Sequence, residues 1–195
     1  RETSLSSEDG WFIGLFIAEG YFKNNGICFE INKETQEHEK LVLYLAKKDI
    51  EYNEIITEEK NEDDGTMISS VTLRSYIYLN KKNMGNELRT LIDNIRSLAP
   101  NKNLPVSFLH LPEEIIGSMI AGVIDGDGVV RNDDPGVSRA VLRMTSKVLL
   151  AQIQQWCDIN KINSSLSSIN NYGERTYRGK IIQSKEQLFM LSFYI

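Results

Sequence analysis

The chain has few cysteines and histidines, the residues that form disulfides or bind metals. Its 195 residues contain two cysteines, Cys28 and Cys157, and two histidines, His38 and His110. Neither cysteine lies in a spacing typical of a metal or redox site, so we expect both to be packing residues rather than parts of a disulfide framework. The histidines are isolated, which favours a surface or capping role for each.

Long hydrophobic runs are also missing. No apolar run reaches the roughly 20 residues that span a membrane, and residues 1–20 lack the basic start and cleavage site of a signal peptide. We therefore expect a soluble intracellular protein with no membrane partner. With 41% hydrophobic residues, the length suits one compact domain or two small halves that share a core.

An overall excess of basic residues is absent as well, since the net charge is −5. Residues 1–66 contain 16 acidic and 7 basic residues, whereas residues 67–195 contain 11 acidic and 15 basic residues. The acidic excess is concentrated between residues 30 and 64 and is best interpreted as solvated surface. Local basic strands can still hold a phosphate backbone, so a nucleic-acid partner is not excluded.

What the chain does contain is one apolar run that occurs twice. Residues 12–20 read FIGLFIAEG and residues 120–128 read IAGVIDGDG, at an offset of 108 residues. In each run a carboxylate precedes a glycine, which is typical of a helix closed by a left-handed cap. Similar patterns follow both runs, so we predict a duplication: helix, two strands, helix and two strands, with a last helix visible in the first half only.

The predicted fold class is α+β, with two pseudo-symmetric αββαββ(α) halves packed through the two motif helices. We expect halves at residues 1–97 and 113–195, joined by a linker at 98–112 that holds three of the four prolines. Interior glycines cost about 1 kcal/mol relative to alanine, so close helix packing must compensate for them. The small residues that share a face at this interface are Gly14, Ala18, Gly122 and Gly126.

Two acidic residues occupy the same place in the two runs. Glu19 and Asp127 each lie at a predicted helix C-terminus, where the helix dipole disfavours negative charge. Side-by-side packing would bring them together, and each would raise the pKa of the other. Bound Mg²⁺ would resolve the conflict, because it prefers carboxylate oxygens. The alternative is two ordinary buried helices whose acids lie at exposed ends.

At these residues the sequence resembles the LAGLIDADG homing endonucleases of the intein type, also called the dodecapeptide family. IAGVIDGDG keeps six of the nine family letters and differs at Ile120, Val123 and Gly126. FIGLFIAEG is looser and has Glu19 where the second run has Asp127. The resemblance implies metal-assisted hydrolysis of DNA phosphodiester bonds, with these two acids as catalytic ligands of Mg²⁺. It also implies a monomer that binds a long double-stranded DNA site along a saddle formed by two sheets.

The resemblance extends to Lys102. This lysine lies in the stretch KNLP, 25 residues before Asp127, and intein-type members of the family carry a similar Lys-x-x-Pro stretch. The resemblance implies that Lys102 is catalytic and polarises the attacking water or stabilises charge on the phosphate. The alternative is a surface lysine in the linker, and the position of a counterpart lysine for the second half stays open.

Basic and aromatic residues alternate with apolar residues in the predicted strands. In SVTLRSYIYLN, for example, Arg74 and Tyr76 share one face while Leu73 and Ile77 share the other. Such strands predict a sheet with helices behind it and phosphates in front, although a solvated face is the alternative. The expected DNA-binding residues are Lys23, Arg74, Tyr76, Arg131, Arg139, Arg143, Arg178 and Lys180.

Two further functional hypotheses stay open. The first is a cleavage-inactive LAGLIDADG protein that binds nucleic acid, either an intron maturase or a DNA-binding regulator. The second is an α+β domain with a duplicated core and no nucleic-acid role, which leaves the paired acids unexplained. The target sequence, and whether the chain belongs to an intein, an intron or a free-standing gene, do not follow from the sequence.

Overall fold

The computed structural model describes residues 3–61, 70–95, 101–134, 137–169, 173–177, 180–184 and 187–195. Within these ranges it contains five α-helices, two four-stranded antiparallel sheets and a small two-stranded sheet, so the predicted α+β class is confirmed. In chain order the elements are α1 (Ser7–Glu19), β1 (Gly20–Lys23), β2 (Gly26–Asn32), α2 (Gln36–Lys47), β3 (Tyr52–Asn61), β4 (Ser70–Asn80), η1 (Lys81–Asn83), α3 (Asn86–Asp93), η2 (Phe108–His110), α4 (Glu113–Asp127), β5 (Gly128–Asp134), β6 (Val137–Met144), α5 (Lys147–Ile159), β7 (Ser164–Ile169), β8 (Gly173–Tyr177), β9 (Lys180–Ser184) and β10 (Leu188–Tyr194).

The two large sheets have matching strand orders, β1-β2-β4-β3 and β5-β6-β10-β7. The second half differs from the prediction, because β8 and β9 form their own hairpin between β7 and β10. Burial explains why β10 takes the inner place beside β6. Leu191 and Phe193 are buried, and they pair with the buried Leu142 and Ala140 of β6.

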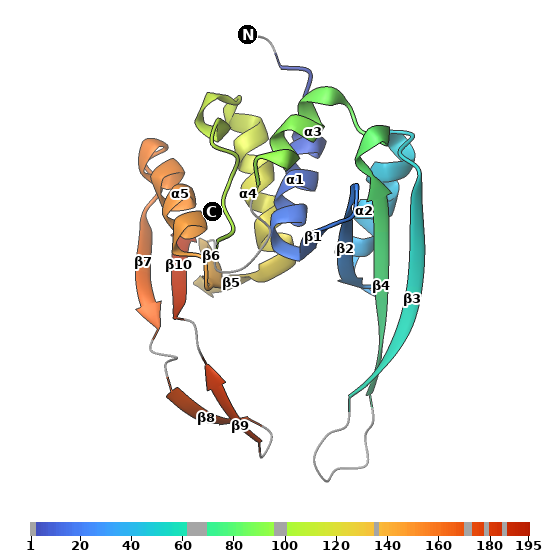
Figure 1. The fold of residues 1–195 in the computed structure, drawn as a ribbon. Helices are drawn as coiled ribbons and strands as arrows, with labels where there is room; N and C mark the ends of the chain where they lie inside the picture. The colour runs from blue at the N-terminus through green and yellow to red at the C-terminus, as the bar shows by residue number, and fades with distance from the viewer. Residues whose placement is uncertain are drawn as a thin grey trace.

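Figure 1 shows the arrangement of these layers. Helices α1 and α4 lie side by side at the centre, with one large sheet on each side of them. The β3–β4 hairpin and the β8–β9 hairpin extend beyond the helices in the same direction, which is also the direction in which both helices run toward their C-termini. The ends of the two motif helices therefore face the space between the sheets.

Helix α1 is buried on all sides because apolar residues fill nearly every position. Phe12 and Phe16 are fully buried, and Phe12 stacks on Tyr44 of α2 at a ring-centroid distance of 4.7 Å. Both phenylalanines also contact Phe29 of β2. A helix without a polar face must be enclosed, so α1 lies in the centre of the protein.

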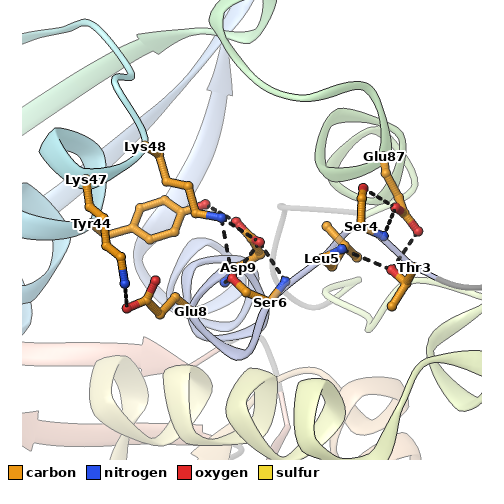
Figure 2. Close-up of polar contacts among 10 residues, drawn as sticks. All are labelled: Thr3, Ser4, Leu5, Ser6, Glu8, Asp9, Tyr44, Lys47, Lys48 and Glu87. Atoms are coloured by element: carbon orange, nitrogen blue, oxygen red, sulfur yellow. Dashed lines mark hydrogen bonds and ion pairs between the residues drawn. The ribbon is translucent and has the colours of Figure 1, made fainter.

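Polar contacts fix the N-terminus of α1 to α2, as Figure 2 shows. Ser6 caps the helix: its backbone N–H donates to Asp9 at 2.8 Å, and its hydroxyl accepts from the Asp9 backbone. The Tyr44 hydroxyl and the Lys48 ammonium group also donate to the Asp9 carboxylate, at 2.7 and 2.9 Å. Asp9 is only 4% exposed, so its charge depends on these donors.

The isolated cysteines and histidines can now be placed. Cys28 and Cys157 are buried and free, as predicted for packing residues. His110 is exposed, but the surface prediction for His38 is wrong. His38 is 7% exposed, and its Nε2 lies 2.9 Å from the carboxylate of Glu54 on β3.

Candidate functional site

The two motif helices approach until their backbones touch, and glycines permit this. A Cβ atom on Gly14 would overlap the carbonyl oxygen of Met119, and one on Gly122 would overlap the carbonyl oxygen of Trp11. These contacts repeat at the offset of 108 residues seen in the sequence, since Met119 corresponds to Trp11 and Gly122 to Gly14. The structure therefore places these predicted interface glycines at the helix contact.

The contact continues to the C-terminal ends of both helices. A Cβ atom on Gly126 would overlap the Cβ of Ala18 and lie 3.1 Å from Cγ of Glu19. Close packing at this point brings Glu19 beside the last turn of α4, which ends at Asp127. The carboxylates of the two helices consequently belong to one site.

The glycines that follow the acids serve a different purpose from the predicted one. Gly20 has φ −98° and Gly128 has φ −105°, so both are extended and neither forms a left-handed cap. Each begins the first strand of its half directly. Space decides the residue type instead, because a Cβ atom on Gly20 would overlap the Phe16 ring and one on Gly128 would lie 2.7 Å from the Ile124 carbonyl oxygen.

The electrostatics of the site favour uptake of a proton or a cation. Burial and repulsion from Asp127 raise the pKa of Glu19 to about 7, although the positive charges of Lys102 and Arg74 oppose this. Burial also raises the pKa of Asp127 above its usual value, and Lys102 again acts in the opposite direction. Two carboxylates with raised pKa values at helix C-termini form a site that a divalent cation would stabilise.

Lys102 lies at this site, although it is distant from both motifs in sequence. Its Nζ donates to the carbonyl oxygen of Ala18 at 2.5 Å and lies 3.6 Å from Oδ2 of Asp127. Its side chain is only 16% exposed, so it is not a surface lysine of the linker. The ammonium group therefore neutralises charge at the ends of both helices.

The donor set fits Mg²⁺ as a partial shell. Glu19 and Asp127 supply hard oxygen ligands, while Mg²⁺ takes six and keeps several from water and substrate phosphates. Within the ranges that the structure describes, no group of three or more His, Cys, Asp and Glu side chains is placed to hold a metal ion. A metal bound by Glu19 and Asp127 would thus complete its shell with oxygens from water or a bound substrate.

Six of the eight predicted DNA-binding residues fall on the faces of the two large sheets that lie away from the core. In the first sheet, Arg74 and Tyr76 alternate with the buried Ser75 and Ile77, and Lys23 at the end of β1 is exposed. In the second sheet, Arg131 pairs across from Arg139, and the exposed Arg143 follows on the same face. Arg178 lies outside the described residues, and Lys180 begins β9.

Sequence reasoning missed two residues on the face of the first sheet. Glu30 pairs with Tyr76, whose hydroxyl lies 3.4 Å from its carboxylate, and its charge contributes to the raised pKa of Glu19. Ile55 pairs with Tyr76 from the other side and is 64% exposed. The alternation in GICFEIN places Glu30 on this face, but a search restricted to basic and aromatic residues finds neither Glu30 nor Ile55.

Solved structures with the same fold include LAGLIDADG proteins. The full-length DUF199/WhiA protein from Thermatoga maritima matches with a TM-score of 0.56 at 12% identity, over 97% of this chain and 52% of its own. The N-terminal LAGLIDADG domain of DUF199/WhiA matches at 0.52 and 12% identity, over 98% and 76%. A variant of the homing endonuclease I-DmoI, solved with its target DNA and 2 mM Mg, matches at 0.52 and 11% identity, over 96% and 88%.

These likenesses show that the chain has the LAGLIDADG fold. The chain spans about half the length of the full-length WhiA protein. No protein-family model matches the sequence, and no characterised protein matches it by sequence. None of the described helices combines the length and the apolar content needed to cross a membrane. The intein-type subtype stays a prediction.

Proposed function

We propose that the protein is a site-specific endonuclease that cuts both strands of DNA by Mg²⁺-dependent phosphodiester hydrolysis. The observation that carries this proposal is the meeting of Glu19, Asp127 and Lys102 at the joined ends of α1 and α4. No structural need explains two desolvated carboxylates at this place. A metal-dependent reaction at a phosphate explains both the acids and the lysine.

In this proposal the residues of the chain bind, orient and neutralise. Glu19 and Asp127 would hold Mg²⁺, which when bound supplies Lewis-acid stabilisation of the reacting phosphate oxygens. Lys102 is held between the two helix ends, and its positive charge favours the ionised form of Asp127 that would bind the metal. Its positive charge would also stabilise the negative charge that develops on the phosphate.

The two sheet faces would bind a long stretch of double-stranded DNA in the major groove. Support comes from the arginines on the second sheet and from the flanking of the helix ends by both sheets (Figure 1). We further propose a monomer in which residues 1–97 and 113–195 act as two half-sites joined by the linker 98–112. The Lys102–Pro105 stretch supports membership of the intein-type subfamily and a role in the homing of an intein or intron.

A second candidate function is DNA binding without cleavage. The similarity to DUF199/WhiA over 97% of the chain favours it. The same sheet faces would bind DNA in such a regulator, and the acids at the helix ends would serve no reaction. A maturase that binds structured RNA is a variant of this reading, and dependence on the 2′-hydroxyl would reveal it.

A cleavage selection tests the proposal. The purified protein is incubated with a randomised DNA library and Mg²⁺, and the cut ends are sequenced. We expect one long site to be enriched by the wild-type protein and not by the Glu19→Gln, Asp127→Asn double variant. If the wild-type protein cuts nothing, the endonuclease proposal is wrong. Selection for binding in Ca²⁺ would then separate a DNA-binding protein, which enriches a site, from one that binds no DNA.

A further inference from the structure

The segment that carries Lys102 is fixed by side chains of one helix. The hydroxyl of Ser146, which caps α5, donates to the Lys102 carbonyl oxygen at 2.5 Å. Gln152, six residues further along, bonds both backbone groups of Leu104: it accepts from the N–H at 2.8 Å and donates to the carbonyl at 3.4 Å. The segment is therefore held on both sides of Asn103.

Burial makes the Gln152 contact necessary. Leu104 is fully buried, so its backbone N–H and carbonyl groups cannot rely on water. The Asn103 side chain also donates to the Leu104 carbonyl, at 2.6 Å, but the N–H bonds to Gln152. A glutamine amide can donate and accept at once, which suits this pair of backbone groups.

The clamp places Lys102 relative to Asp127. A lysine side chain has four rotatable bonds and loses much conformational freedom when its amine is fixed. Here the Lys102 carbonyl and the backbone of Leu104 are bonded to Ser146 and Gln152. The helix α5 packs on the sheet that also contains β5 and β6, the strands that follow Asp127. Because the backbone of this segment is already fixed, only the Lys102 side chain loses conformational freedom when its amine bonds at the helix ends.

We propose that Gln152 is a positioning residue of the endonuclease, which orients Lys102 by clamping Leu104. The inference rests on the proposed function, since it assigns a role toward the same reaction. Gln152 touches neither DNA nor metal in this role. Ser146 shares the role but also caps α5, so its removal would disturb the helix and give an ambiguous result.

The test compares cleavage by Gln152→Ala, Lys102→Met and the double variant, with the exposed Gln155→Ala on the same helix as a control. We expect Gln152→Ala to lower kcat by about 10- to 100-fold without changing the Kd for DNA in Ca²⁺. In the Lys102→Met background the same change should have no further effect, because the residue acts through the lysine. Gln152→Glu keeps the acceptor for the Leu104 N–H and should restore part of kcat.

An unchanged kcat in Gln152→Ala, or an equal loss in the presence and absence of Lys102, would overturn the inference. A second measurement separates it from the proposed function. Amide hydrogen exchange at Leu104 should accelerate at least about tenfold in Gln152→Ala, as expected when a hydrogen bond worth about 1.4 kcal/mol is lost, while exchange in α5 stays unchanged. If the wild-type protein cuts no DNA, the proposed function is wrong, but the clamp is still tested by hydrogen exchange. Unchanged exchange at Leu104 in Gln152→Ala would reject the clamp itself.

Discussion

At the joined ends of α1 and α4, two carboxylates share one lysine. Burial and repulsion from Asp127 raise the pKa of Glu19 to about 7, and the amine of Lys102 lies 3.6 Å from Asp127. Such a group of charges is costly without a ligand. The balance at this site therefore depends on each of the three side chains, which makes single substitutions informative.

Asp127→Asn should abolish cleavage and leave DNA binding in place. The substitution removes the charge that we propose binds the metal, while it keeps the shape of the side chain, so we expect kcat to fall by at least about 100-fold. The Kd for the selected DNA site, measured in Ca²⁺, should change little. A variant that still cuts at the wild-type rate would remove Asp127 from the catalytic role.

Asp9 makes a second prediction, on the pH dependence of stability. Burial alone would raise the pKa of Asp9, but the bonds from Lys48, Ser6 and Tyr44 outweigh it and hold the pKa below its usual 3.8. The ionised Asp9 therefore stabilises the folded protein fully above pH 3.8, the pKa of the unfolded chain. This stabilisation is lost as the pH falls through the lower pKa that Asp9 has in the folded protein.

Asp9→Asn tests this contribution. At neutral pH we expect a loss of about 1–3 kcal/mol in the free energy of unfolding, and a smaller loss near pH 3, measured by urea unfolding at both values. The exposed Asp158→Asn serves as the control and should change stability little. An equal loss at pH 3 and pH 7 for Asp9→Asn would contradict the argument from the lowered pKa.

At the scale of elements, helix α4 contains two glycines whose replacement should change stability in opposite directions. Gly122 of α4 touches the backbone of α1, whereas the nearest atom to a Cβ on Gly117 of the same helix is a Trp156 side-chain atom at 3.9 Å. Glycine lowers the stability of a helix wherever its small size is not needed. The packing of α1 on α4, and not helix propensity, selects Gly122.

The two glycines therefore predict changes of opposite sign. Gly117→Ala should raise the free energy of unfolding by about 0.5–1 kcal/mol, because alanine favours the helix and fits the space. Gly122→Ala should lower it by at least about 1–3 kcal/mol, because the two backbones must move apart. Thermal unfolding of both variants checks this. Equal effects would show that the helices do not depend on close approach.

At the scale of the whole molecule, the two sheet faces differ in charge. The face of the second sheet carries Arg131, Arg139 and Arg143, whereas the first carries Glu30 beside Arg74 and Tyr76. A face rich in arginine suits phosphate contacts. A face with a carboxylate and an exposed isoleucine suits contacts with base edges, since carboxylates accept from cytosine and apolar groups contact the thymine methyl.

Removal of Arg131 and Arg143 should weaken DNA binding in a salt-dependent way. Each phosphate contact contributes about 0.9 to the slope of log Kd against log salt concentration, so the double alanine variant should lower that slope by about 1.8. Binding titrations from 50 to 200 mM salt measure the slope. Lys161→Gln, at the exposed turn between α5 and β7, should leave it unchanged. No change for the arginine variant would exclude this face from phosphate binding.

Local patterns allowed part of this description to be made from sequence. The two apolar runs predicted the motif helices and the offset of 108 residues that their contacts repeat. The alternation in SVTLRSYIYLN predicted which side of β4 faces the core near Ile77 and Leu79. Patterns of period 3.6 and period 2 are properties of the backbone itself, so they can be read without a structure.

The sequence alone determined the two motif helices, their glycines and the acids that end them, because these are short-range features of one repeated run. Only the tertiary structure decided that β10, and not the β8–β9 pair, lies beside β6. It also decided that Glu30 lies near enough to Glu19 to affect its pKa, and that Gln152 holds the segment of Lys102. Each of these depends on strand pairing or on a side chain that contacts a distant backbone. Such contacts join residues far apart in the chain, and local propensity carries no information about them.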